Sequence, residues 1–133
     1  MLISDAIRIA YMAHEGQLDK SNRPYILHPL AVMNSVEGED AQVVAVLHDV
    51  IEDTPIRLSV LWSLTKTQRN ALDAISRRPN EVYRDYIKRV KLNELATYVK
   101  FADLDHNMSP ERMDGCNNSL MKRYLLAISI LEK

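Results

Sequence analysis

Apolar residues recur at steps of three and four along almost the whole chain. This period matches one face of an α-helix and differs from the strict alternation of a β-strand. Only three glycines and five prolines interrupt the pattern. The chain is therefore predicted to be all-α, a compact single-domain bundle of about seven or eight helices.

Turn residues and capping residues divide this pattern into separate helices. Ser4 is a suitable N-cap for the first helix, and Gly16 ends it. Pro29 suits the first position of a short second helix, and Pro55 closes the third. We expect helices over residues 5–15, 29–36, 40–52, 58–64, 67–76, 80–91, 95–107 and 118–132, with 17–28 as a non-helical loop.

The size of the chain, 133 residues, fits one domain over residues 1–133. The 17 basic and 18 acidic residues give a formal net charge of −1, so no overall field favours nucleic acid or an anionic membrane surface. A phosphate-bearing small ligand needs only a local basic cluster. No signal peptide or apolar stretch of spanning length is present, which predicts a cytoplasmic protein without a membrane partner.

The lone cysteine, Cys116, excludes an intramolecular disulfide and fits a reducing compartment. It lies in a polar Gly-Cys-Asn-Asn stretch. We therefore interpret it as an incidental loop thiol rather than as a nucleophile.

The segment 45–54 sets four ionisable side chains inside an apolar helical pattern. His48 and Glu52 are four apart, as are Asp49 and Asp53, so on a helix the two pairs lie on adjacent stripes. Buried carboxylates and imidazoles that lack partners cost roughly several kcal/mol each. A bound cation is the simplest compensation, and the segment is therefore predicted to form a site.

Two histidines and two aspartates on separate predicted segments, His28, His48, Asp49 and Asp103, form a set of nitrogen and oxygen donors. Such a set suits Mn²⁺, Fe²⁺ or Zn²⁺ without a thiolate. A bundle core can bring donors from several helices together. Taken singly, each histidine also fits a structural role, and Asp103 also fits an exposed acidic helix end.

Several stretches resemble, in order, the motifs of the HD phosphohydrolase superfamily. They are Ala-His-Glu-Gly-Gln at 13–17 with Lys20, Pro-Tyr-Ile-Leu-His-Pro at 24–29, Leu-His-Asp-Val-Ile-Glu-Asp-Thr at 47–54, and Val-Lys-Phe-Ala-Asp at 99–103 with His-Asn-Met at 106–108. Within this superfamily, the chain most resembles the hydrolase domain of Rel/Spo-type guanosine tetraphosphate (ppGpp) hydrolases and their small stand-alone relatives. It covers nearly the whole chain and implies an HD-type helical bundle.

The resemblance implies a division of labour among the acidic and imidazole side chains. Glu52 and Asp53 match the catalytic acidic pair, with Glu52 accepting a proton from the attacking water or holding it in line. Asp53 would orient that water or protonate the leaving oxygen. The implied ligands of one Mn²⁺-like ion are His28, His48, Asp49 and Asp103.

For the substrate, the resemblance implies a nucleotide from which a phosphate or pyrophosphate group is cleaved. The favoured case is the conversion of ppGpp to GDP and pyrophosphate. Lys20 and Ser21 are expected to meet phosphate oxygens, and Tyr25 and Asn107 to line the nucleotide pocket.

Two positions depart from the family pattern, and one of them is Asp105, which stands where small relatives often carry a basic residue. Asp19 stands where ppGpp hydrolases usually carry an arginine, whose planar cation suits stacking on a base. Arg23 is a candidate replacement. The departure keeps two alternatives open: a nucleotide or NADPH phosphatase of the same fold, and a non-catalytic nucleotide-binding HD module.

Other polar and aromatic residues have simpler interpretations. Lys20 is equally consistent with a solvated loop lysine, and Tyr25 with a packing role. We expect structural roles for His14 and His106, a solvated helix end for Arg77-Arg78, and a core position for Trp62.

Overall fold

The computed structural model describes residues 1–113 and 118–133, so Cys116 lies outside the described residues. The described residues confirm the all-α prediction, because helices dominate them and their single β-bridge joins Leu18 and Pro24. In chain order the helices are α1 (Ile3–Ala13), α2 (Leu27–Asn34), α3 (Glu39–Leu47), α4 (Val50–Asp53), the 3₁₀ helix η1 (Leu58–Val60), α5 (Lys66–Ile75), α6 (Tyr83–Lys91), α7 (Glu94–Asn107), α8 (Pro110–Met113) and α9 (Asn118–Glu132).

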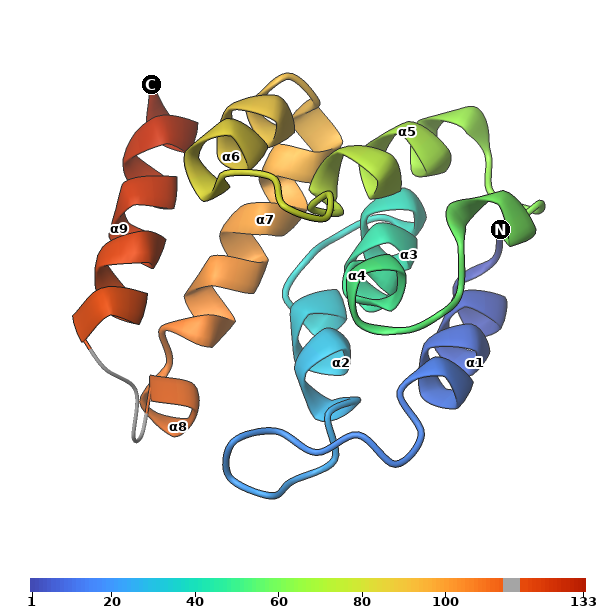
Figure 1. Cartoon of the computed structure of the whole chain (residues 1–133). Helices are drawn as coiled ribbons and strands as arrows, with labels where there is room; N and C mark the ends of the chain where they lie inside the picture. Colours follow the sequence, from blue (N-terminus) through green and yellow to red (C-terminus); the bar gives the residue numbers. More distant parts are fainter. Residues whose placement is uncertain (114–117) are drawn as a thin grey trace.

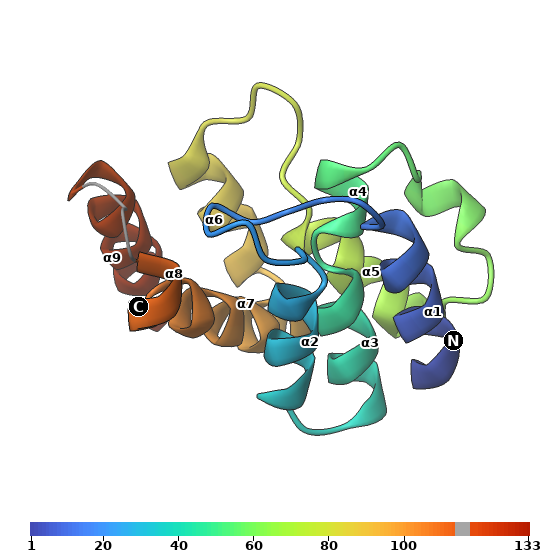
Figure 2. The ribbon, with the colours of Figure 1, turned by 90° about the horizontal axis from the view of Figure 1, so that it is seen from below.

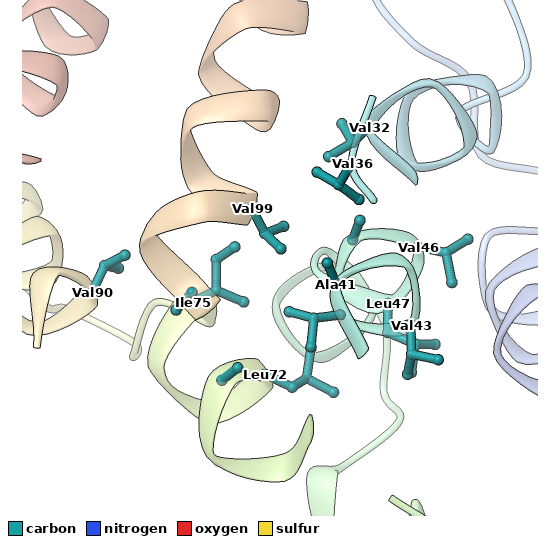
Figure 3. Close-up of a cluster of buried hydrophobic side chains, with 14 of the residues drawn as sticks. Val32, Val36, Ala41, Val43, Val46, Leu47, Leu72, Ile75, Val90 and Val99 are labelled. Atoms are coloured by element: carbon teal, nitrogen blue, oxygen red, sulfur yellow. The ribbon is translucent and has the colours of Figure 1, made fainter. Parts of the chain in front are cut away.

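Helix α3 forms the centre of the molecule. It contacts α1, α2, α5 and α7, and Figure 3 shows its side chains meeting those of α2, α5 and α7 in the core. Its residues 43–47 are all fully buried. This buried half of α3 is apolar on every face because other helices surround it, whereas Glu39, Asp40 and Gln42 lie in the first half of the helix.

Helices α6, α7 and α9 form the other end of the molecule, opposite α1 (Figures 1 and 2). Helix α9 packs against α6 and α7, and its residues Ala127 and Leu131 are buried. Its bounds coincide with those predicted from the sequence. Helix α7 joins the two ends, because it also contacts α2, α3 and α5.

The single helix predicted over 40–52 is wrong. Helix α3 ends at Leu47 and a separate turn, α4, begins at Val50. The backbone tightens between them, since the His48 N–H bonds to the Ala45 carbonyl and Asp49 has φ −98° and ψ −6°.

The helix predicted over 58–64 is also wrong beyond the 3₁₀ turn at Leu58–Val60. Leu61, with ψ 59°, leaves the helical region. Leu61 and Leu64 are buried, whereas Trp62 is 84% exposed, so the predicted core position of Trp62 is wrong. The Arg69 side chain donates to the carbonyl oxygens of Leu58 and Leu61, which ties this turn to α5.

Several helix ends differ from the predicted ones. Helix α1 is preceded by Leu2 as N-cap rather than Ser4. Pro29 is the third rather than the first residue of α2, still in the turn where no N–H partner is needed. Helix α6 starts three residues later than expected, because Asn80 has a left-handed φ of 63°. None of the described helices is long and apolar enough to cross a membrane.

Candidate functional site

Four predicted ligand residues meet in one buried cluster. The Asp103 Oδ1 atom lies 2.9 Å from His28 Nε2 and 3.0 Å from His48 Nε2. The Asp49 Oδ2 atom lies 3.1 Å from His48 Nε2 and 3.6 Å from His28 Nε2. The structure therefore brings together all four donors, which come from α2, the α3–α4 turn and α7.

The spacing of these atoms suits a shared metal ion. Two donors bound about 2.1 Å from an octahedral ion lie about 3 Å apart, as the imidazole and carboxylate atoms here do. His28, His48 and Asp49 each offer a ligand atom within 4.8 Å of the others. The donor set also fits chemically, since it combines two imidazoles with two carboxylates.

The outward-facing nitrogens of both imidazoles are already engaged. His48 Nδ1 lies 2.6 Å from the Ala45 carbonyl oxygen, which can only accept, so this nitrogen carries a proton. His28 Nδ1 lies 2.7 Å from His106 Nδ1, and the two rings stack with centroids 5.0 Å apart. Such partners orient a ligating histidine and leave Nε2 for the metal. His106, which we expected to have a structural role, contacts the ring of the proposed ligand His28.

Three further side chains surround the aspartates. Lys100 Nζ donates to Asp103 Oδ2 at 2.8 Å, and Asn107 Nδ2 donates to Asp103 Oδ1 at 3.3 Å. The Tyr25 hydroxyl donates to Asp49 Oδ2 at 2.7 Å. These bonds hold the carboxylates in orientation. The sequence predicts that Tyr25 and Asn107 line a nucleotide pocket. In the structure, their side chains also donate hydrogen bonds to Asp49 and Asp103.

The charges in the cluster perturb one another. Burial disfavours the charged His48 ring, but the Asp49 and Asp103 carboxylates outweigh it and hold the pKa of His48 above its usual range. Burial instead dominates at His28 and lowers its pKa. Burial opposes ionisation of Asp103, yet the Lys100 and His48 charges keep its pKa well below the ordinary value. The cluster therefore retains its carboxylates in the ionised, ligating form.

Glu52 and Asp53 lie at the solvent-facing side of this cluster. Both residues are exposed, so the expectation that these two carboxylates are buried is wrong. The Glu52 carboxylate accepts a hydrogen bond from the backbone N–H of Arg77. Gln17 Nε2 donates to the Asp53 carbonyl oxygen at 3.1 Å, while Gln17 Oε1 lies 2.9 Å from His14 Nδ1. His14 thus supports the segment that carries Asp53.

Both acidic side chains are nevertheless harder to ionise than usual. Neighbouring protein atoms displace water from the Glu52 carboxylate, and with the negative charge of Asp49 this raises the pKa of Glu52 to about 7, although the Arg77 N–H opposes the shift. Desolvation and the charge of Asp49 likewise raise the pKa of Asp53 to about 6. A carboxyl group with a pKa near neutrality suits proton transfer.

A cleft of about 250 Å³ opens over the cluster, and cationic side chains line it. His28, Asp49 and Asp103 form part of its lining together with Glu52 and Asp53. The cationic side chains in the lining are Arg77, Lys100, Arg112 and Arg123. The cleft thus combines a potential metal site with positive charge that suits phosphate groups.

A neighbouring pocket of about 210 Å³ shares five lining residues with the cleft: Tyr25, Asn107, Arg112, Leu120 and Tyr124. The four residues predicted to bind substrate, Lys20, Ser21, Tyr25 and Asn107, all line this pocket. It also contains the apolar residues Leu18 and Leu120. The predicted substrate residues therefore lie together beside the acidic cluster.

Asp19 has a structural role that its sequence position did not reveal. Its Oδ1 atom accepts hydrogen bonds from the backbone N–H groups of Ser21 and Arg23, at 2.8 and 3.0 Å. The hydrogen bond from Arg23 leads the effects that lower the pKa of Asp19. Arg23 itself pairs with Glu111 at 3.2 Å. Asp19 thus shapes the loop, and Arg23 joins it to α8.

Sequence reasoning missed several residues at this site. Lys100 is one of them: its place three residues before Asp103 allows an ion pair on one helix face, but its burial appears only in the structure. Arg77 had been expected at a solvated helix end, but its backbone contacts Glu52 and its side chain lines the cleft. Arg123 and Tyr124 gave no local signal, because α9 reaches the cleft only through tertiary packing.

Comparison with known proteins agrees with this geometry. The chain is 32% identical, over 133 aligned positions, to a probable guanosine-3′,5′-bis(diphosphate) 3′-pyrophosphohydrolase of Synechocystis, with 84% of this chain and 18% of the relative covered. The homologues of this chain are Rel/SpoT-type ppGpp hydrolases. Other Rel/SpoT homologues are the Haemophilus influenzae 3′-pyrophosphohydrolase, at 31% identity over 75% of this chain, and the Escherichia coli bifunctional (p)ppGpp synthase/hydrolase SpoT, at 30% over 80%. The chain covers 17% of each of these two proteins.

The fold of this chain also has a counterpart among solved structures. A metazoan orthologue of SpoT, described as hydrolysing ppGpp, superposes with a TM-score of 0.77 at 20% identity, covering 97% of this chain and 84% of that one. The chain matches no protein-family model. The structural likeness shows the fold, and the sequence relatives show the homology.

Proposed function

We propose that this chain is a metal-dependent hydrolase that removes the 3′-pyrophosphate of ppGpp, giving GDP and pyrophosphate. The observation that carries the proposal is the convergence of the donors His28, His48 and Asp49, joined by Asp103, beside Glu52 and Asp53 in a cleft whose lining includes cationic side chains. The activity named for the Synechocystis and Haemophilus relatives supports the choice of substrate.

The proposed ligands of the metal, with Mn²⁺ favoured, are His28, His48, Asp49 and Asp103. A divalent ion held there supplies a water of lowered pKa and a positive charge for a phosphoryl oxygen. The protein's own part is to fix the donors, through Ala45 and His106 for the imidazoles and through Tyr25 and Lys100 for the carboxylates.

In the proposed reaction, a water oxygen bonds to the phosphorus attached to the 3′ oxygen, and the bond between that phosphorus and the 3′ oxygen breaks. Glu52 accepts a proton from the water, and the 3′ oxygen gains a proton as it leaves. Asp53 orients the water or supplies that proton. The raised pKa values of both carboxyl groups, about 7 and about 6, suit such transfers near neutral pH.

The substrate would extend from the cleft into the neighbouring pocket. Lys20 and Ser21 are proposed to contact phosphate oxygens, and Tyr25 and Asn107 to border the nucleotide. The positive side chains of the cleft favour a ligand with several phosphates. Residues 1–133 are proposed to act as one hydrolase unit in the cytoplasm, without a nucleic-acid or membrane partner.

A product-resolved assay tests this proposal. Purified, Mn²⁺-loaded protein is incubated with ppGpp, NADPH and simple mononucleotides, and the products are separated by chromatography. We expect GDP and pyrophosphate from ppGpp. Orthophosphate from NADPH or a mononucleotide, with ppGpp intact, would instead favour a phosphatase. Tight binding of ppGpp without any product would favour a non-catalytic binding module.

A further inference from the structure

The loop between α5 and α6 contacts the proposed proton acceptor directly. The backbone N–H of Arg77, the first residue after the Ser76 C-cap of α5, donates to the Glu52 carboxylate. Glu52 lies on α4, 25 residues earlier in the chain. The direction in which the Glu52 carboxylate points therefore depends on the conformation of a loop outside its own helix.

Glu81 holds that loop from its far end. The Arg77 guanidinium donates twice to the Glu81 carbonyl oxygen, at 3.0 and 2.7 Å. The Glu81 carboxylate accepts from the Arg78 backbone N–H at 3.0 Å. Between them, Asn80 adopts a left-handed φ of 63°. The loop is thus closed by hydrogen bonds that converge on Glu81.

Arg89, on α6, anchors Glu81 and the end of α5 together. Its Nε and Nη2 atoms bind the two Glu81 carboxylate oxygens, at 3.1 and 2.8 Å. It also donates to the carbonyl oxygens of Asp73, Ala74 and Ser76 at 3.0 to 3.2 Å. These carbonyls are the ones that a helix C-terminus leaves unpaired. A single arginine therefore fixes the loop to both helices.

We propose that Glu81 and Arg89 are positioning residues for Glu52, because their ion pair holds the loop that points the Arg77 N–H at the Glu52 carboxylate. The inference rests on the proposed function only for the role of Glu52 as proton acceptor. Neither Glu81 nor Arg89 is among the residues that line the cleft or its neighbouring pocket. Their effect on the reaction must therefore pass through Arg77 and Glu52.

The variant Glu81→Gln tests the inference without changing any residue of the cleft. A displacement of a catalytic group by about 1 Å costs roughly 100-fold in rate. We therefore expect kcat for ppGpp to fall at least about tenfold, with a smaller rise in KM, since the same loop also holds the Arg77 guanidinium, which lines the cleft. Arg78→Gln is the matched control, because it removes a side chain that caps the same end of α5, through Asp73 and Ser76, without touching the Glu81 carboxylate.

A second measurement needs no activity. Amide hydrogen exchange, followed by NMR on the whole chain, reports on the Arg77 N–H. We expect at least about tenfold faster exchange at Arg77 in Glu81→Gln and unchanged exchange in Arg78→Gln, with the amides of the α3 core protected in both. Arg89→Lys, which keeps the charge but not the paired geometry, should give the same direction of change if Glu81→Gln does not fold.

The two readouts separate failure of this inference from failure of the proposed function. If the unmodified protein does not cleave ppGpp, the proposed function fails, and the Arg77 amide alone decides the inference. The inference is overturned if the Arg77 amide exchanges at the same rate in the unmodified protein and in Glu81→Gln. It is also overturned if Glu81→Gln changes KM rather than kcat, or if Arg78→Gln lowers kcat equally.

Discussion

His48 and Asp49 are neighbours in the chain, yet both side chains reach the same cluster. On a continuous helix, adjacent side chains diverge by about 100°. Here α3 ends at Leu47 and the backbone tightens through His48 and Asp49 before α4 begins. His48 and Asp49 nevertheless contribute to one cluster, because His28 and Asp103 approach them from other helices.

Asp49→Asn tests this ligand assignment at the level of a single atom. It keeps the shape of the side chain but removes the charge from a residue whose side chain is only 13% exposed. We expect affinity for Mn²⁺ to fall at least about tenfold, since loss of a residue that merely orients a ligand already costs roughly 10- to 100-fold. Metal analysis after equilibrium dialysis gives the measurement. Asp105→Asn, an exposed aspartate on the same helix as Asp103, is the matched control and should bind as before. Equal metal content in Asp49→Asn and the unmodified protein would contradict the assignment.

Residue chemistry makes the proposed metal ligands predictable from the sequence, whereas the burial or exposure of a side chain depends on tertiary packing. His28, His48, Asp49 and Asp103 were predictable because ligand chemistry and motif order restrict the residue types. The exposure of Glu52 and Asp53 was not, since it depends on how the rest of the chain packs around α4. The partner of Asp103, Lys100, follows from a rule that a buried lysine needs a carboxylate, but only tertiary packing reveals that the position is buried.

The helices themselves were predicted best where local signals and packing agree. Helix α9 has the predicted bounds, and α7 begins one residue earlier than expected, where the Asn93 side chain caps it. The helix predicted over 58–64 is wrong because the local apolar pattern and the packing of individual side chains favour different structures there. The apolar residues at 58–64 resemble a helix, but Leu61 and Leu64 are anchored in the core while Trp62 points outward. No local rule distinguishes these alternatives.

Thr65 starts α5 with a capping box, since its hydroxyl accepts from the Gln68 N–H while the Gln68 side chain accepts from the Thr65 N–H. We expect Thr65→Ala to lower the free energy of unfolding by about 1 kcal/mol. Urea unfolding followed by circular dichroism measures it. Trp62→Ala, three residues away and largely exposed, should change it by less than about 0.5 kcal/mol. A larger loss for Trp62→Ala than for Thr65→Ala would overturn the assignment of the cap.

The ion pair between Glu81 and Arg89 predicts a pH-dependent contribution to stability. The hydrogen bonds from Arg89 lower the pKa of Glu81 from 4.5 to about 2. Because the folded-state pKa lies below the unfolded one, this stabilisation is complete above about pH 4.5 and is lost as pH falls toward 2. The difference in unfolding free energy between the unmodified protein and Glu81→Gln should therefore be constant from pH 7 to pH 5 and shrink at pH 4 and pH 3. Urea titrations at these pH values provide the test, and a difference that grows on acidification would contradict it.

The whole molecule consists of two helical ends joined by α7, and the site lies where they meet. The donors His28, His48 and Asp49 belong to the end built around α3, whereas Arg77, Arg123 and Tyr124 reach the cleft from the loop before α6 and from α9. Motif order alone predicted the first group. The second group required the packing of α9 on α6 and α7, which no sequence motif of this chain indicates.

The measurement that tests the central claim most directly is the product ratio from ppGpp. Mn²⁺-loaded protein and Glu52→Gln, brought to the same metal content, are incubated with ppGpp and the products are separated by ion exchange. The account predicts GDP and pyrophosphate in equal amounts from the unmodified protein, and a rate at least about 100-fold lower in Glu52→Gln, the typical loss of a general base. Orthophosphate as the sole released product, no release at all, or equal rates in the two proteins would contradict it.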